Sequence, residues 1–226
     1  MTAAGGCISV PVSIKMGRSK WRRSLLLLAT LVFSLCLPAA ARAHSTIQGL
    51  EGFSAGALHP LTTPAHLLVI AALGLFIGQR SPLDLKAPLL IFVPCLTFAL
   101  IFLTTGLVKA VYQPVLIGLA LCAAIPVALE KPLSPWACRT LSAAAAFAIG
   151  FDSGPEPSSA GGLLKTLLGT WVMVIFLVFD IAYHTSLAMR GSWSRVGVRV
   201  LGSWIIAISL MVLALSLVSF RSVTVF

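Results

Sequence analysis

Charged residues are scarce in this 226-residue sequence. Only 10% of the residues are Asp, Glu, Lys or Arg, and 58% are hydrophobic. With a mean hydropathy of +1.02, the chain is too apolar for an ordinary soluble domain. A G-x-x-x-x-G-K-[ST] phosphate-binding loop is also missing, so the sequence gives no sign of nucleotide hydrolysis within this chain. The composition predicts an all-α polytopic membrane protein embedded in a lipid bilayer.

Paired cysteines and a clustered basic face are missing as well. Cys95, Cys122 and Cys138 lie in or beside apolar segments without a C-x-x-C spacing, so we expect no disulfide. The formal charge of +10 does not indicate nucleic-acid binding, because the basic residues neither cluster on a soluble face nor interleave with aromatics beyond the N-terminus. We expect no nucleic-acid partner.

Residues 1–43 have the features of a secretory signal peptide. In SKWRRSLLLLATLVFSLCLPAAARAH, a basic start precedes an apolar stretch at 25–37, a helix-breaking proline and small residues. This pattern predicts cleavage after Ala43; the alternative is an uncleaved first transmembrane helix. Cleavage would leave ten Lys and Arg against six Asp and Glu, a net charge of +4. Residues 44–226 would then form one transmembrane domain.

Six apolar stretches in that domain approach the length that crosses a bilayer, about 30 Å of hydrocarbon. They are predicted at 62–79, 87–108, 112–129, 134–151, 163–183 and 197–219. No internal repeat indicates an inverted-repeat transporter. The connectors on one side carry seven basic residues against three on the other, the seven being Arg80, Lys86, Lys131, Arg139, Arg190, Arg195 and Arg199. The positive-inside rule therefore predicts an inner-membrane protein with both mature termini on the outer, periplasmic side.

Two histidines lie in GALHPLTTPAHLL, at the start of the first span. Thr63 and Pro64 are typical of a helix N-cap and first helical position, which places His66 in the first turn and His59 before it. On one straight helix the two rings would lie about 10 Å apart, too far to share a metal ion. Pro60 and Pro64 predict a break that lets the rings converge. The alternative is that both are interfacial histidines bonded to backbone or lipid headgroups.

A second polar cluster, GFDSGPEPSS, follows the fourth span on the same predicted side. Its carboxylates, Asp152 and Glu156, flank a Gly and Pro turn. A carboxylate is needed near the imidazoles because the positive end of a helix dipole opposes a bound cation. We therefore expect an outer metal site built from His59, His66, Asp152 and Glu156. The alternative for this cluster is a solvated loop.

Three further polar residues are candidates. After cleavage, the free amine and imidazole of His44 could chelate a divalent transition metal; the alternative is a disordered terminal residue. Asp180 and His184, at i and i+4 in FDIAYHT, could form an inner relay or exit site on one helical face. Here the alternative is a hydrogen-bonded pair that only joins helices.

Together the two motifs resemble the HupE/UreJ family of small nickel and cobalt permeases. HPLTTPAHLLVIAALG keeps the His-Pro pair, the second histidine and the closing Gly74 of the family's first-helix motif, and GFDSGPEP keeps Gly150, Gly154, Glu156 and Pro157 of its fourth-helix motif. The sequence departs from the family at Ala65, where the resemblance implies an acid. It departs again at Phe151, Asp152 and Ser153, where the resemblance implies histidines.

The resemblance implies a membrane permease for nickel or cobalt, with the metal as its substrate and no tightly bound cofactor. The alternative is a non-transporting accessory or metal-binding protein of a hydrogenase- or urease-type system, with metalloenzyme-assembly partners. Transport would be facilitated, ion-coupled or driven by a separate partner. We expect no enzyme activity, because an intramembrane hydrolase would need Ser153 and His184 at hydrogen-bond distance, and the predicted topology places them on opposite sides.

Overall fold

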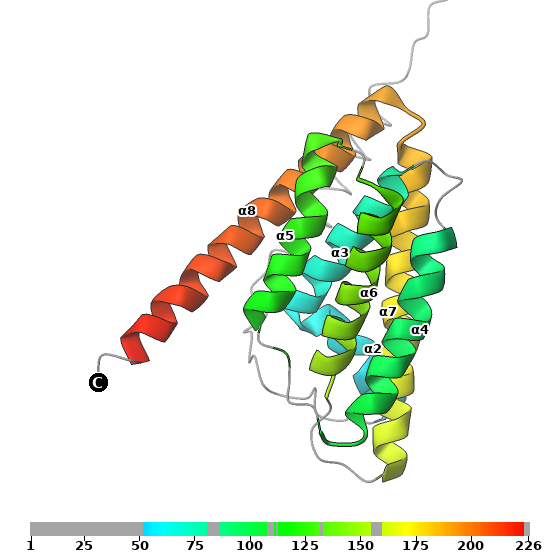
Figure 1. Cartoon of the computed structure of the whole chain (residues 1–226), viewed down its shortest axis with the longest axis vertical. Helices are drawn as coiled ribbons and strands as arrows, with labels where there is room; N and C mark the ends of the chain where they lie inside the picture. Colours follow the sequence, from blue (N-terminus) through cyan, green and yellow to red (C-terminus); the bar gives the residue numbers. More distant parts are fainter. Residues whose placement is uncertain are drawn as a thin grey trace, which may run out of the picture. The chain divides into compact units, whose positions relative to one another are not determined.

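The structure is a computed structural model that describes residues 52–80, 86–107, 111, 113–131, 133–154 and 160–223. The chain divides into two units, Met1–Ser45 and Thr46–Phe226. The predicted signal peptide and His44 belong to the first unit and lie outside the described residues. The described part of the second unit is all-helical (Figure 1), with helices α2 (Phe53–Thr62), α3 (Pro64–Gln79), α4 (Lys86–Leu103), α5 (Gln113–Leu129), α6 (Pro135–Asp152), α7 (Ala160–Ala188) and α8 (Ser192–Val223).

Helix α3 is the centre of the bundle. Its sequence, PAHLLVIAALGLFIGQ, is apolar on every face rather than on one stripe, which is the pattern of a helix enclosed by others. Eleven of its sixteen residues are buried, and it packs mainly against α5 and α7. The largest buried side chains of α3 include Ile70, Leu73, Phe76 and Ile77. The one charged or titratable side chain buried among them is His66.

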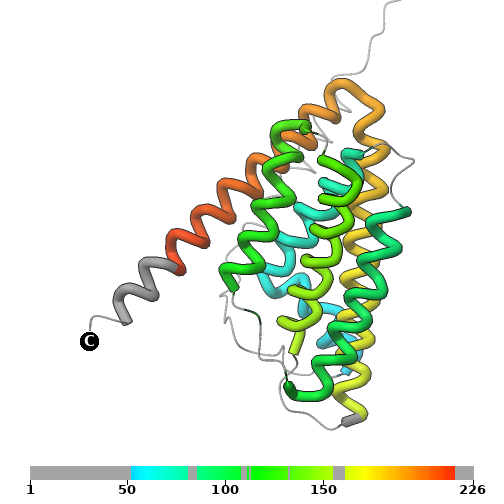
Figure 2. The backbone as a smooth tube through the Cα atoms, in the orientation of Figure 1, coloured from blue at the N-terminus to red at the C-terminus, as the bar shows by residue number. Residues whose placement is uncertain are grey.

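A sharp bend separates α2 from α3. The two helices meet at 77°, and the backbone path through the bend can be followed in Figure 2. Thr63 is extended, with φ −97° and ψ 104°, as expected for a residue that precedes proline. The break therefore comes from Pro64 alone. Pro60 lies inside α2, which corrects the expectation that both prolines interrupt the helix.

Glycines let α3 and α6 approach their neighbours closely. A Cβ added to Gly74 would lie 2.7 Å from the side chain of Ile181 on α7. One added to Gly150 would lie 2.5 Å from the Cβ of Ala99 on α4. Small residues at such positions bring helices together in membranes, where burial of apolar surface gives little driving force. Two glycines of the sequence motifs are thus packing positions that fix α3 against α7 and α6 against α4.

Three described helices are long and apolar enough to cross a bilayer, namely α4, α7 over Gly161–Ala188 and α8 over Ser192–Ser216. Helices α2 and α3 meet the same criterion together as one bent span. Helix α5 is apolar but has only 17 residues, and α6 carries Arg139 and Asp152. The prediction of a polytopic all-α membrane protein is confirmed. The count of six spans stays a prediction.

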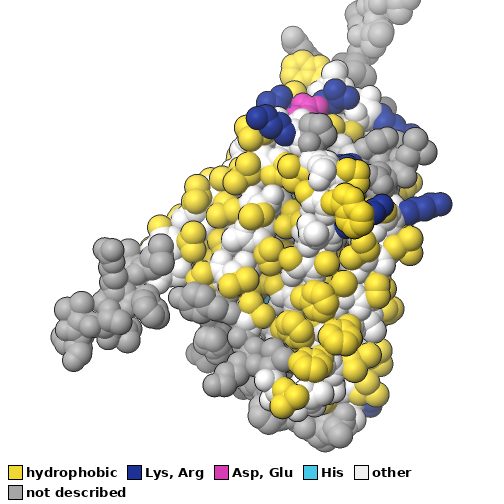
Figure 3. All heavy atoms as spheres, in the orientation of Figure 1, with side chains coloured by type: hydrophobic (Ala, Val, Ile, Leu, Met, Phe, Trp, Pro, Cys, Tyr) yellow, Lys and Arg dark blue, Asp and Glu magenta, His cyan; other side chains and the backbone are white. Residues whose placement is uncertain are grey.

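The surface has the character of a lipid-facing bundle. Large hydrophobic side chains are exposed on its sides, among them Leu90, Phe98, Ile101, Leu168, Phe176 and Met211. Figure 3 shows hydrophobic side chains covering the visible face, while most of the visible Lys and Arg gather toward the end where α7 turns into α8. Such a surface would be unstable in water and is suited to hydrocarbon.

Polar contacts tie several helix ends together at that basic end. Gln79 donates to the carbonyl of Val127 over 3.0 Å, and Arg199 Nε donates to the carbonyl of Ala128 over 3.2 Å. The carboxylate of Glu130 lies 3.5 Å from Arg195 and 3.7 Å from Arg199. These bonds satisfy the last carbonyls of α5, which the helix itself leaves without donors. The ends of α3 and α5 and the start of α8 therefore lie together, opposite the first turn of α3.

Candidate functional site

A buried histidine and a carboxylate meet at the other end of α3. His66 lies in the first turn of α3 and is fully buried, and its Nε2–H donates to Asp152 Oδ2 over 2.9 Å. Asp152 is the last residue of α6, with a side chain 18% exposed. Because Asp152 is helical and bonded to His66, the solvated-loop alternative does not describe it. Nor does the interfacial alternative describe a fully buried His66.

The bend at Thr63 brings His59 to the same place. The ring centroids of His59 and His66 lie 5.1 Å apart, with the ring planes at 81°. Two ring nitrogens, His59 Nε2 and His66 Nδ1, are buried and have no hydrogen-bond partner. An unpaired buried polar atom costs free energy, typically about 1–3 kcal/mol. Two such atoms on adjacent rings therefore favour a ligand that both can bind.

The remaining predicted ligands do not complete this cluster within the described residues. In that part of the chain, no group of three or more His, Cys, Asp or Glu side chains is arranged to hold a metal ion. Glu156 and His44 lie outside the described residues. The structure thus brings together His59, His66 and Asp152, and the role of all five as metal ligands stays a prediction.

The predicted inner relay lies elsewhere. Asp180 and His184 approach to 3.4 Å within α7, and their side chains are 44% and 68% exposed. This bond lies within one helix, so it does not join two helices, and the exposed pair does not line the bundle interior beside His66. Ser153 Oγ donates to the carbonyl of Ile149, at the opposite end of the bundle from His184. The expected separation of Ser153 and His184 therefore agrees with the fold.

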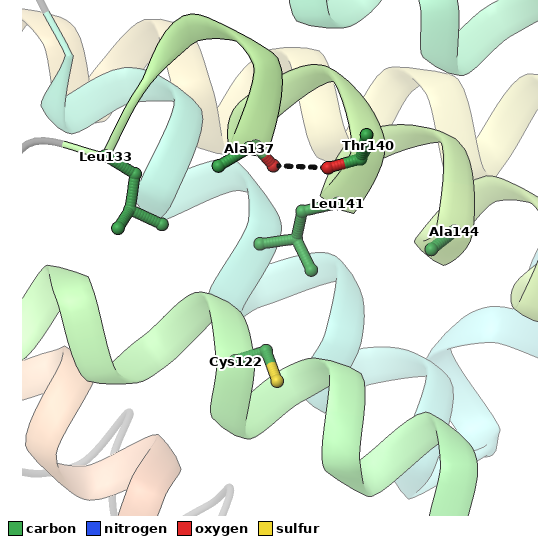
Figure 4. A pocket seen from close by; sticks show the side chains of 6 residues that line it. All are labelled: Cys122, Leu133, Ala137, Thr140, Leu141 and Ala144. Carbon is green, nitrogen blue, oxygen red and sulfur yellow. Dashed lines mark hydrogen bonds between the residues drawn. The ribbon is translucent and has the colours of Figure 1, made fainter.

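An apolar groove between α5 and α6 is a separate feature. Its volume is about 350 Å³, and Figure 4 shows Cys122 of α5 facing Leu141 of α6 across it. The one hydrogen bond drawn there is internal to α6, from Thr140 Oγ1 to the carbonyl of Ala137. No His, Asp or Glu lines the groove, so it lacks the chemistry of the histidine cluster. Among the described residues, Cys95, Cys122 and Cys138 form no disulfide.

Sequence reasoning missed the structure that carries His59. The segment before the bend is a helix, α2, and it packs directly on α7. A Cβ on Gly56 would lie 1.8 Å from the carbonyl oxygen of Thr166, and one on Gly169 would lie 2.1 Å from the carbonyl oxygen of Phe53. The available signal was Gly56 itself, because a glycine in an apolar segment often lets a neighbouring helix approach closely in a membrane.

Comparison with known proteins gives the family. A family model described as HupE / UreJ protein matches residues 31–213. The chain belongs to the HupE/UreJ family. Neither the comparison with curated proteins nor that with solved structures found a match. The HupE/UreJ family is associated with nickel and cobalt transport or with accessory functions for hydrogenase and urease.

The residues of the two HupE/UreJ motifs fall into two groups, glycines at helix contacts and histidines of the cluster. Gly74 and Gly150 fix helix contacts, whereas His59 and His66 form the cluster. Ala65, where the sequence departs from the resemblance, is 4% exposed and belongs to the hydrophobic core. No carboxylate approaches His66 from that position. The carboxylate beside His66 comes instead from Asp152 on α6, a position that also departs from the resemblance.

Proposed function

We propose that this protein is a permease for a divalent transition metal, nickel or cobalt, and that His59 and His66 capture the ion from the outer side. The observation that carries the proposal is the pair of buried, unpartnered nitrogens on adjacent rings. Neutral imidazole is a ligand for nickel, cobalt, copper and zinc, so the family association narrows the choice to nickel and cobalt. We propose no enzyme activity and no resident cofactor.

The separation of the rings suits joint ligation. When two imidazoles bind one ion tetrahedrally with nitrogen–metal bonds of about 2.1 Å, each ring centroid lies about 3.2 Å from the ion and the centroids lie about 5.2 Å apart. The observed separation is 5.1 Å. Two imidazoles leave the ion short of ligands, so further donors would come from Glu156, from His44 or from water, since the carboxylate of Asp152 is bonded to the far side of the His66 ring.

Asp152 supports the site through its hydrogen bond to His66. By accepting a hydrogen bond from Nε2–H, its carboxylate fixes the tautomer in which His66 Nδ1 carries the lone pair. A carboxylate behind a metal-binding imidazole also raises the basicity of the ring and orients it. The carboxylate adds one negative charge, which favours a dication at the positive end of the α3 dipole.

The proposed orientation rests on the distribution of charge. The basic connectors lie at the end of the bundle opposite the histidine cluster, and short basic connectors remain on the inner side of a membrane. We therefore place the cluster on the periplasmic side of the inner membrane, with both mature termini there. Fusion of a periplasm-active phosphatase to the C-terminus should give an active enzyme; an inactive phosphatase together with a fluorescent cytoplasmic reporter fusion would reverse the orientation.

Metal uptake tests the function. Cells that express the protein should accumulate radioactive nickel or cobalt above control cells, and His66→Ala should abolish the gain. Thr140→Val is the matched control, because Thr140 is exposed on α6 and its hydroxyl donates to the carbonyl of Ala137 in the same helix, and this variant should transport normally. If the purified protein binds metal but uptake does not rise, the non-transporting accessory function is the better account. If it binds no metal, both accounts fail.

A further inference from the structure

The hydroxyl of Thr170 on α7 reaches the backbone of α2. Thr170 is 1% exposed, and its Oγ1 donates to the carbonyl of Gly56 over 3.0 Å. The same hydroxyl lies 3.2 Å from the carbonyl of Thr166 in its own helix. A threonine hydroxyl has one proton to donate, so the bond between helices competes with the ordinary bond within α7.

The Gly56 carbonyl is available for this bond because of Pro60. In an α-helix the carbonyl of residue 56 accepts from the N–H of residue 60, and proline has no N–H. A buried carbonyl without a donor is costly, and Gly56 is buried. Thr170 therefore replaces the donor that Pro60 removes, and the replacement comes from another helix.

This contact acts on the position of His59. Gly56 and His59 are three residues apart on α2, so they are neighbours on the helix surface. On the α7 side, the close contacts of Gly56 with Thr166 and of Gly169 with Phe53 leave no room for an added Cβ. The hydrogen bond opposes sliding of α2 along α7, because sliding would separate the Thr170 hydroxyl from the carbonyl of Gly56.

We propose that Thr170 is a positioning residue for the histidine cluster. Through the carbonyl of Gly56 it holds α2 so that the ring of His59 stays beside that of His66. The proposal deepens the proposed function and, for its metal readout, rests on it. Loss of the hydroxyl should weaken metal binding without removing any ligand.

Nickel titration of the purified full chain gives the first test. Thr170→Val keeps the shape but removes the donor, and we expect the nickel Kd to rise about tenfold, within the 10–100-fold range for groups that orient metal ligands. Thr170→Ser keeps the hydroxyl and should stay within about twofold of the parent. Thr185→Val is the matched control: Thr185 is also buried on α7 but lies about 22 Å further along the helix, and its Kd should not change.

The pairing with Pro60 gives a sharper test. Pro60→Ala restores an N–H that can donate to the Gly56 carbonyl within α2, so Thr170→Val should cost less than about threefold in that background. Equal effects of Thr170→Val in the two backgrounds would overturn the proposal. So would a Thr170→Ser protein as weak as Thr170→Val.

A readout without metal separates this proposal from the proposed function. Diethylpyrocarbonate acylates neutral imidazoles, and peptide mass spectrometry follows each histidine separately. Thr170→Val should raise the acylation rate of His59 several-fold, with the exposed His184 as internal reference. If the parent binds no nickel, the proposed function fails and this rate alone decides the proposal. An unchanged His59 rate in Thr170→Val would overturn it.

Discussion

Replacement of Asp152 by Asn probes the electrostatics of the histidine cluster most directly. The side-chain oxygen of Asn can still accept the hydrogen bond from His66 Nε2–H, which Asp152 accepts over 2.9 Å. Only the negative charge is lost. The substitution therefore separates the charge of residue 152 from its hydrogen bond, which removal of the whole side chain would not do.

The expected loss of nickel affinity in Asp152→Asn follows from the geometry of the cluster. An ion bound at His66 Nδ1 would lie about 7 Å from the carboxylate, and a dication and a single negative charge at that distance attract by about 5 kcal/mol at an effective dielectric of 20. The side chain of Asp152 is 18% exposed, so water weakens this attraction. Measured losses for groups behind metal ligands are 10–100-fold, or about 1.4–2.7 kcal/mol. We expect Asp152→Asn to weaken nickel binding within that range.

Calorimetric titration of the purified protein measures the change, and Asp180→Asn is the matched control. Asp180 is the other described aspartate, and it is exposed and paired with His184 on α7. It should leave the nickel Kd unchanged. A loss far beyond 100-fold in Asp152→Asn would show that the carboxylate itself binds the ion. An Asp152→Asn protein with the affinity of the parent would refute the reasoning, as would equal losses in the two variants.

Three further predictions concern packing, pH and the residue before His66. Gly150→Ala places a Cβ 2.5 Å from that of Ala99 and should lower thermal stability in detergent by about 1–3 kcal/mol, whereas Gly118→Ala, whose new Cβ meets nothing within 4 Å, should not destabilise. Metal affinity should fall as pH is lowered from about 7.5 to 5.5, because protons compete for imidazole nitrogens; a pH-independent Kd would exclude histidine ligands. Ala65→Asp forces a carboxylate into a position that is 4% exposed, so the Tm without nickel should be lower than that of the parent. Adding nickel should raise the Tm of Ala65→Asp more than it raises the Tm of the parent. A rise no larger than in the parent would show that residue 65 does not face the ion.

Much of the helical framework was predictable because hydrophobic length is a local property. Runs of apolar residues with few charges placed α3 to α8 within five residues of their observed ends. The agreement is best for α5, at Gln113–Leu129 against a predicted 112–129. Pro64 marked the start of α3 because proline favours the first helical position and excludes a helical residue before it. Helix α2 was not predicted, because its ten residues are too few to cross a bilayer.

The candidate site was predictable in its residue types and only partly in its geometry. The two histidines around a proline break indicated convergence, and the structure gives the separation of their rings. That Asp152 would be helical and bonded to His66 Nε2 depends on how α6 packs, over 86 residues of separation in the chain. Thr170 is 114 residues from Gly56, and nothing in its local sequence distinguishes it from other threonines in apolar helices.

The sequence by itself therefore determined that this protein is a helical membrane protein, where α3 begins and which side chains carry the donor atoms of metal ligands. Those properties depend on hydrophobicity, on the missing N–H of proline and on the chemistry of imidazole, all of which act within a few residues. Only the tertiary structure decided which imidazole nitrogens stay unpaired, which carboxylate supports His66 and which hydroxyl holds α2. Those outcomes depend on contacts between helices. Close packing through glycines such as Gly56 and Gly150 selects one arrangement, because a side chain at either position would collide with the neighbouring helix.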